Sequence, residues 1–146
     1  MSYSLAFAQA IAVVTYVAFK VEHGLHTFVP TKDIAQALNL ANPTAVKILQ
    51  SLSRAGIIET REGAKGGVHL AKAPPTVTLL DIFHAIERER PLFRIDLKMR
   101  ISNVHTQHAL ECVSTTFDRA EEAMKAELRV TTIADLLLQP GQGSPT

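Results

Sequence analysis

The sequence contains a single cysteine, Cys112, among its 146 residues, and it has no long uninterrupted apolar run. One cysteine excludes an intramolecular disulfide framework, and together with the lack of a recognisable export signal it indicates the reducing cytoplasm. The most apolar stretch, residues 5–19, is interrupted by Gln9 and Thr15 and is short for a membrane span. We therefore expect a cytoplasmic protein with no membrane partner, in which this stretch forms a buried helix.

The sequence also lacks the residue combinations that catalysis requires. It has no nucleophile with a base at a recognisable spacing and no strong metal triad. The glycine-rich stretch Gly63–Gly67 lacks the Lys-Ser/Thr ending of a phosphate-binding loop. Because 47% of the residues are hydrophobic and 20% are charged, a packed core is expected. We expect a binding protein and not an enzyme.

Charge is unevenly distributed along the chain, although the net charge is only +1. Residues 42–72 carry five basic and two acidic side chains, residues 88–102 carry five and two, and residues 103–146 carry three and six. A basic half and an acidic half fit a body that presents one face to a polyanion such as DNA. Segment charges of this size are also common as ordinary solvated charge, so charge alone leaves both interpretations open.

The spacing of apolar residues predicts a mostly α-helical fold with a small β-hairpin. Helices are expected over residues 4–22, 32–38, 42–55, 79–88, 103–129 and 133–138. Thr31 and Asn42 are the expected N-caps of the two short helices near the middle of the chain. Strands at 57–61 and 68–71 flank the glycine-rich turn. Two short helices, a tight turn and a hairpin with glycines at its tip make a winged helix-turn-helix unit.

The chain is expected to divide into four regions. These are a winged helix domain at 1–88, a linker at 89–102, a region at 103–138 with a long dimerisation helix and a short last helix, and a flexible tail at 139–146. Either Thr76 or Thr78 caps the helix after the hairpin, and either Thr131 or Thr132 caps the last one. In the long helix, apolar side chains recur every three or four residues, which predicts a seam for a partner helix. The seam consists of Val113, Phe117, Ala120, Met124 and Leu128.

The second helix of the pair can lie in a DNA major groove, which is wide enough for one helix. Its first turn usually reaches deepest, so Asn42, Thr44, Ala45 and Lys47 are expected nearest the bases. Val46 is expected to face the core. Backbone amides of residues 32–34 are expected to hold a phosphate. The full set of expected DNA contacts is Thr31, Lys32, Asn42, Thr44, Ala45, Lys47, Ser51, Arg54, Arg61, Lys65, Gly66 and Gly67.

Two other interpretations of this region remain open. The hairpin could be an ordinary one with solubilising charges, and the whole unit could be a winged helix module that binds proteins and never touches DNA. The basic side chains Lys47, Arg54, Arg61 and Lys65 favour DNA.

Three candidate metal ligands share one face of the long helix. His105, His108 and Cys112 stand at i, i+3 and i+7, and imidazole and thiolate bind zinc, copper or iron. Such residues also arise readily as a solvated or interface stripe with a buried thiol, so we expect no metal there. Cys112 could act as a redox switch, but cysteine is more often a small buried hydrophobe.

Residues 47–87 resemble the core of the Rrf-two family of bacterial winged helix regulators. The resemblance lies in the recognition helix, in the wing pattern Gly-x-x-Gly-Gly, in Leu-Ala-Lys, and in Thr-Leu-Leu-Asp-Ile with the Ala-Ile-Glu that ends the next helix. These motifs occupy Lys47–Leu52, Gly63–Gly67, Leu70–Lys72 and Thr78–Glu87, and Thr132–Leu137 resembles the closing motif. The resemblance implies a sequence-specific DNA-binding transcriptional regulator, as a rule a repressor. It also implies a homodimer on a pseudo-palindromic operator.

The chain departs from this family at the linker. Family sensors often hold an iron–sulfur cluster with three cysteines before the long helix, whereas this sequence has none between 88 and 111, and His105 aligns with the third. Asn42-Pro43 resembles a subgroup that often lacks these cysteines. The resemblance therefore implies a regulator without an iron–sulfur cluster or other cofactor. A small-molecule or redox effector is not named by the sequence, and a pocket between the first helix, the 79–88 helix and the long helix is one place for it.

Overall fold

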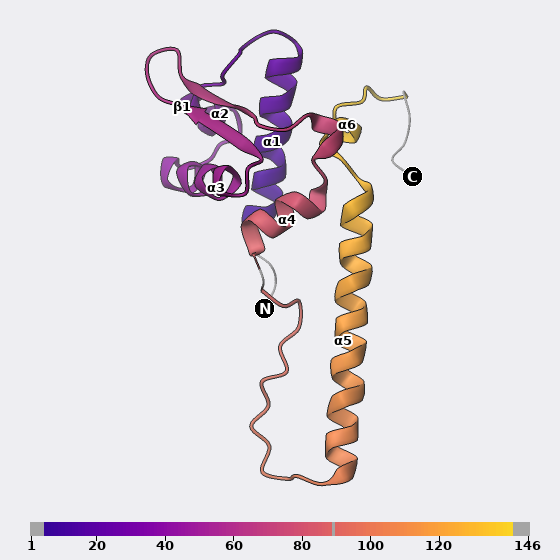
Figure 1. Ribbon diagram of the computed structural model, residues 1–146. Coiled ribbons are helices and arrows are strands. Elements are labelled where there is room, and N and C mark those ends of the chain that lie inside the picture. Colours follow the sequence, from indigo (N-terminus) through magenta and orange to yellow (C-terminus); the bar gives the residue numbers. More distant parts are fainter. Residues whose placement is uncertain (1–4, 89, 142–146) are drawn as a thin grey trace.

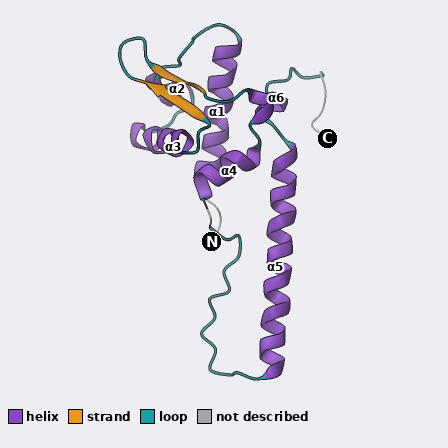
Figure 2. Cartoon of the chain, in the orientation of Figure 1, coloured by secondary structure: helices purple, strands orange, loops and turns teal. Residues whose placement is uncertain are grey.

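The computed structural model describes residues 5–88 and 90–141 and confirms the mostly helical fold with one hairpin and a long C-terminal helix (Figures 1 and 2). Residues 1–4, 89 and 142–146 lie outside the described residues, and they include most of the flexible tail expected at 139–146. The elements are α1 (Ala6–Glu22), α2 (Thr31–Ala37), α3 (Asn42–Arg54), β1 (Ile58–Arg61), β2 (Gly67–Leu70), the 3-10 helix η1 (Pro74–Thr76), α4 (Leu79–Glu87), α5 (Val104–Val130) and α6 (Ile133–Leu136). None of the described helices combines the length and apolarity that crossing a bilayer requires.

The core forms around α1, as its near-continuous apolar sequence predicts. Val13, Val14 and Val17 of this helix are fully buried. They belong to one cluster with Leu52 of α3 and Ile82 of α4. Burial of this kind contributes about 1.5–3 kcal/mol for each large aliphatic side chain, so the packing of α1 fixes the positions of α3 and α4.

The wing is a two-stranded hairpin that is joined by one isolated β-bridge to the connector before α2. In the β1–β2 hairpin Ile58 pairs with Leu70 and Arg61 with Gly67. Val29 and Val68 exchange two backbone hydrogen bonds of 2.8 Å, so β2 lies between β1 and the connector. Gly67 permits this approach: its φ is +144°, and a Cβ there would collide with the Val29 carbonyl. The apolar connector is therefore held against β2 at Val29.

The expected caps of the helix-turn-helix were wrong by one residue. Thr31 and Asn42 are the first helical residues of α2 and α3, and neither caps with its side chain. The N-caps are Pro30 and Ala41, whose ψ angles of 137° and 141° turn the chain into the helix. The Ala41 carbonyl accepts the first α3 hydrogen bond from the Ala45 amide at 3.0 Å. Backbone turns at these two positions replace the predicted side-chain caps.

The C-terminal helix α6 belongs to the same core as the winged unit. The segments 77–79 and 131–133 lie antiparallel: the Leu79 amide donates to the Thr131 carbonyl at 2.9 Å, and the Ile133 amide donates to the Val77 carbonyl at 2.8 Å. We call this pairing the α4–α6 junction. Ile133 is fully buried in the main cluster. The short last helix therefore packs with α1 and η1.

Two matching capping boxes resolve the open choice of caps at the junction. Thr78 caps α4 with Asp81, and Thr132 caps α6 with Asp135. In each box the threonine hydroxyl accepts the aspartate amide, and the aspartate carboxylate accepts the threonine amide at 2.8–2.9 Å. Each box satisfies two helix-end amides that would otherwise lack partners.

The side chains of the long helix α5 are exposed or half-buried. Its N-cap is Asn103, whose side chain accepts the Thr106 amide at 2.9 Å, and none of its residues is buried. The linker runs alongside α5 to the end of that helix farthest from the winged unit, and there the chain turns into α5 (Figure 1). Phe93 stacks on Phe117 with ring centroids 4.4 Å apart, and the Leu92 amide donates to Glu121 at 2.9 Å.

Replacing Thr132 by alanine removes the hydroxyl that accepts the Asp135 amide. We expect the free energy of unfolding to fall by about 1 kcal/mol, the usual contribution of an N-cap side chain, in urea denaturation. Thr131→Ala, one residue outside the capping box, is the matched control and should change it much less. An equal loss in both variants would contradict the role of the cap.

Candidate nucleic-acid interface

Helix α3 presents a polar face that is rotated from the predicted one. Its buried side chains are Ala45, Ile48, Leu49 and Leu52, with Ala45 only 1% exposed. The exposed ones are Asn42, Pro43, Val46, Lys47, Gln50, Ser53 and Arg54, while Thr44 and Ser51 are half-buried at one edge. Two expectations are thereby corrected: Ala45 faces the core and Val46 faces outward, 46% exposed.

Gln50 is a surface residue that the sequence pattern did not indicate. It lies on the outward side of α3, opposite the buried stripe, between Lys47 and Arg54. The sequence predicts Val46 in the core because it is apolar, and a helix that buries Val46 would turn Gln50 away from its exposed face. The spacing of Ala45, Ile48 and Leu52 would have located the true face, since small and aliphatic residues at i, i+3 and i+7 share one side.

Two adjoining surface depressions join α3 to the start of α2 and to the wing. One is lined by Thr31, Val46, Gln50, Arg54 and Thr60, among others. The other is lined by residues of the α2 start and the wing, including Thr31, Lys32, Thr60, Arg61, Gly66 and Gly67. Because Thr31 and Thr60 belong to both, the two depressions form one continuous surface, which is lined by six of the twelve predicted contacts: Thr31, Lys32, Arg54, Arg61, Gly66 and Gly67. Lys65 lies exposed in the turn between the strands.

The base of the wing carries a stack of charged and aromatic side chains, which we call the wing stack. The Arg61 guanidinium lies 4.5 Å from the centroid of the Phe28 ring. Phe28 also stacks on His69 with centroids 4.5 Å apart, and His69 Nε2 donates to Glu59 Oε2 at 2.8 Å. Pairing of Glu59 with His69 and of Arg61 with Gly67 sets these residues on one face of the hairpin.

Phe28 in the wing stack is not among the residues that the sequence pattern predicts. It stands in the connector before α2, far along the chain from Arg61, and only the Val29–Val68 pairing brings it to the wing. A single aromatic in a connector gives no local signal of such a contact. The stack restricts the long Arg61 side chain and so lowers the entropy it loses on binding.

The two wing glycines and the α2 amides have structural roles. A Cβ at Gly66 would collide with the Arg61 carbonyl, and Gly66 donates its amide to Gly63 at 3.0 Å. Of the predicted phosphate-binding amides, those of Asp33 and Ile34 already donate to the Pro30 carbonyl at 3.0 and 3.2 Å. The expected anion site at residues 32–34 is therefore reduced to the Lys32 amide and side chain.

The candidate ligands on α5 do not form a metal site among the described residues. His108 Nε2 lies 3.6 Å from Cys112 Sγ, but no group of three or more His, Cys, Asp or Glu side chains comes together in the part of the chain described. His105 is exposed. The Cys112 thiol is also exposed, so the expectation of a buried thiol is corrected for the single chain.

The predicted seam is an apolar stripe on an exposed helix. Val113 is 41% exposed and Ala120 is exposed, while Phe117, Met124 and Leu128 are half-buried. At Phe117 the cover comes from Phe93 of the linker. The helix that carries the stripe, α5, extends away from the winged unit on the right of Figure 1, whereas α3 lies at the left.

A family model described as Rrf2, iron-dependent transcriptional regulator, matches residues 3–139. The chain belongs to the Rrf2 family. It is 34% identical over 113 residues to the HTH-type transcriptional regulator NsrR of Geobacillus kaustophilus, covering 73% of this chain and 71% of that protein. The Rrf2 assignment confirms the predicted function of a DNA-binding transcriptional regulator and not an enzyme.

Solved structures confirm the winged helix fold of this Rrf2 protein. The global cysteine regulator CymR of B. subtilis superposes with a TM-score of 0.67 at 22% identity, covering 93% of this chain and 95% of that one. The T. potens IscR superposes with a TM-score of 0.69 at 20% identity, covering 100% and 94%.

Replacing Phe28 by alanine should weaken binding to promoter DNA about threefold in fluorescence anisotropy, because a partly exposed cation–π contact contributes about 0.5–1 kcal/mol. Phe28→Tyr retains the ring and should keep the affinity. In an Arg61→Ala background, Phe28→Ala should have no further effect. Equal losses in both backgrounds would mean that Phe28 acts through the fold and not through Arg61.

Proposed function

We propose that this Rrf2 protein is a sequence-specific repressor that acts in the cytoplasm as a homodimer on a pseudo-palindromic operator. The observation that carries the proposal is the continuous surface formed by α3, the start of α2 and the wing. On the opposite side, the exposed helix α5 offers a stripe for a second copy. The two features suit a dimer with both recognition helices turned the same way.

In this proposal α3 enters the major groove with its outward face. Lys47 and Gln50 contact base edges, with Thr44 at the edge of that face, since side chains of this kind form directed hydrogen bonds to bases. Arg54, Thr31 and Lys32 contact phosphates on either side, which fixes the register but not the sequence.

The wing follows the adjacent minor groove. Arg61, held by Phe28 in the wing stack, and Lys65 in the turn supply positive charge there. A narrow minor groove concentrates negative potential and attracts such side chains. Much of the affinity then comes from phosphate neutralisation and falls with salt.

Dimerisation of α5 would set the distance between the two half-sites. The helix has 27 residues and is about 40 Å long. Val113, Ala120 and the rest of the stripe provide apolar surface that a second α5 can cover. Half-sites one helical turn apart, about 34 Å, suit recognition helices on opposite sides of such a pair.

The residues present do not fit an iron–sulfur cluster, although the family is described as iron-dependent. Cluster iron is held by cysteine thiolates, and Cys112 is the sequence's single cysteine. Its neighbour His108 adds one imidazole at 3.6 Å from the sulfur. We therefore propose that DNA binding here requires no cluster, and that the linker contributes apolar contacts such as Phe93 on Phe117 instead.

The double substitution Arg61→Ala with Lys65→Ala should weaken binding to the promoter region by at least tenfold and reduce the salt dependence by about two counterions. Lys47→Ala or Gln50→Ala should instead change which base pairs are preferred. Gel shifts with iron-free protein in a chelator provide the measurement. The matched control is Lys98→Ala with Arg100→Ala, which removes the same charge from the linker. Unchanged binding in both wing and α3 variants would remove the proposed interface.

Val113→Asp should convert the dimer to monomer, because it places two carboxylates in an apolar interface. Since Val113 is 41% exposed in the single chain, the protomer should remain folded. Analytical ultracentrifugation at micromolar concentration distinguishes the states. Thr115→Asp, on the other side of α5, should leave the dimer intact. A Val113→Asp protein that sediments as a dimer would place the interface elsewhere.

A further inference from the structure

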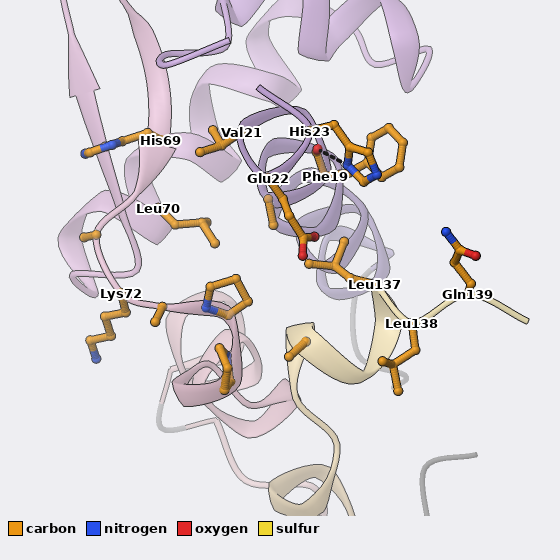
Figure 3. A pocket seen from close by; sticks show the side chains of 16 residues that line it. Phe19, Val21, Glu22, His23, His69, Leu70, Lys72, Leu137, Leu138 and Gln139 are labelled. Carbon is orange, nitrogen blue, oxygen red and sulfur yellow. Dashed lines mark hydrogen bonds between the residues drawn. The ribbon is translucent and has the colours of Figure 1, made fainter. Parts of the chain in front are cut away.

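A cavity of about 820 Å³ lies at the base of the wing, away from the DNA-facing surface (Figure 3). The C-terminal turn of α1, the chain from β2 to η1, and α6 with the residues after it form its walls. It differs from the pocket expected between α1, α4 and α5, because neither α4 nor α5 contributes to its lining. Its size is within the range of small-molecule sites.

The lining is mainly apolar. Leu70 of β2 and Leu137 after α6 point toward the interior from opposite walls (Figure 3). Ala18, Pro74 and Ala134 complete the apolar surface. The β2 end, α1 and α6 belong to the same packed core, so the walls are held in place without a ligand. Such a cavity favours a ligand with an apolar body.

The charge around this cavity favours a cation. Figure 3 shows the Glu22 carboxylate turned toward the interior beside Leu137, whereas the Lys72 ammonium points away from it. His23 turns its Nδ1 to the Phe19 carbonyl of its own helix, at 2.9 Å. The C-terminal end of α1, a helix of 17 residues, adds the partial negative charge of the helix dipole. Glu22 and the helix end therefore act in the same direction.

We propose that the cavity binds an amphipathic organic cation, with its apolar body between Leu70 and Leu137 and its ammonium group at Glu22. Such a ligand would act as an effector, and this second part rests on the proposed function. Leu70 and His69 are successive residues of β2 and both line the cavity, and His69 also belongs to the wing stack. A ligand that contacts Leu70 therefore contacts the strand that carries the wing stack.

Three probes share the same phenyl group and four-carbon chain and differ in the charge of their end group: 4-phenylbutylamine, 4-phenylbutanol and 4-phenylbutyrate. Comparing their affinities separates the effect of charge from that of apolar burial. Isothermal titration of the full-length dimer should give at least tenfold tighter binding of the amine than of the other two. Glu22→Gln should weaken the amine about fivefold and leave the alcohol unchanged, since it removes one partly exposed ion pair and keeps the shape. Glu22→Lys should shift the preference to the carboxylate.

Glu62→Gln removes a carboxylate from the wing turn, outside the cavity, and should leave all three affinities unchanged. Equal affinity for the three probes, or no effect of Glu22→Gln, would overturn the site.

Promoter affinity is then measured with and without saturating amine, and a change of at least threefold is expected in the wild type and not in Glu22→Lys. Binding of the amine without this change would overturn the effector role. Loss of promoter binding in the ligand-free protein would instead contradict the proposed function.

Discussion

The α4–α6 junction is the constraint on which the rest of the structure depends. Two backbone hydrogen bonds join Val77 and Leu79 to Thr131 and Ile133, which are far apart in the sequence. They bring Ile133 into the core that also holds α1 and α3. They also fix the end of α5 against the winged unit, so that the direction of α5 relative to α3 is set by hydrogen bonds and not by the linker alone. In a dimer this direction determines how far apart the two α3 helices lie.

Features that depend on neighbouring residues could be predicted from the sequence. The periodicity of α1, the glycines of the wing and the threonine–aspartate pairs of the capping boxes each act within a few residues, so their patterns point to the structure. The caps at Thr31 and Asn42 were wrong because a backbone turn at the preceding residue served the same purpose. A prediction from residue type looks for a side chain that can accept a hydrogen bond. Pro30 and Ala41 have no such side chain, so the prediction misses both N-caps.

Features that depend on distant contacts could not be predicted. The approach of Phe28 to Arg61 requires the Val29–Val68 pairing, and the inclusion of α6 in the core requires the junction. The rotation of α3 has a different origin: Val46 and Ile48 are both β-branched and apolar, and Ile48 is buried because it shares a helix face with Ala45 and Leu52, whereas Val46 does not. The candidate interface therefore stays a prediction, in which the structure moves Ala45 into the core and adds Gln50 to the exposed face of α3.

The late position of Ile133 has a consequence for synthesis of the protein. Every other fully buried residue of the core precedes the long helix, so a ribosome completes nearly the whole winged unit before α6 is made. A polypeptide that terminates before residue 131 leaves Val77 and Leu79 without backbone partners and leaves a hole where Ile133 packs. Such a fragment would be a substrate for cellular proteases rather than a competitor for promoters. Completion of translation is therefore coupled to stability of the part that recognises DNA.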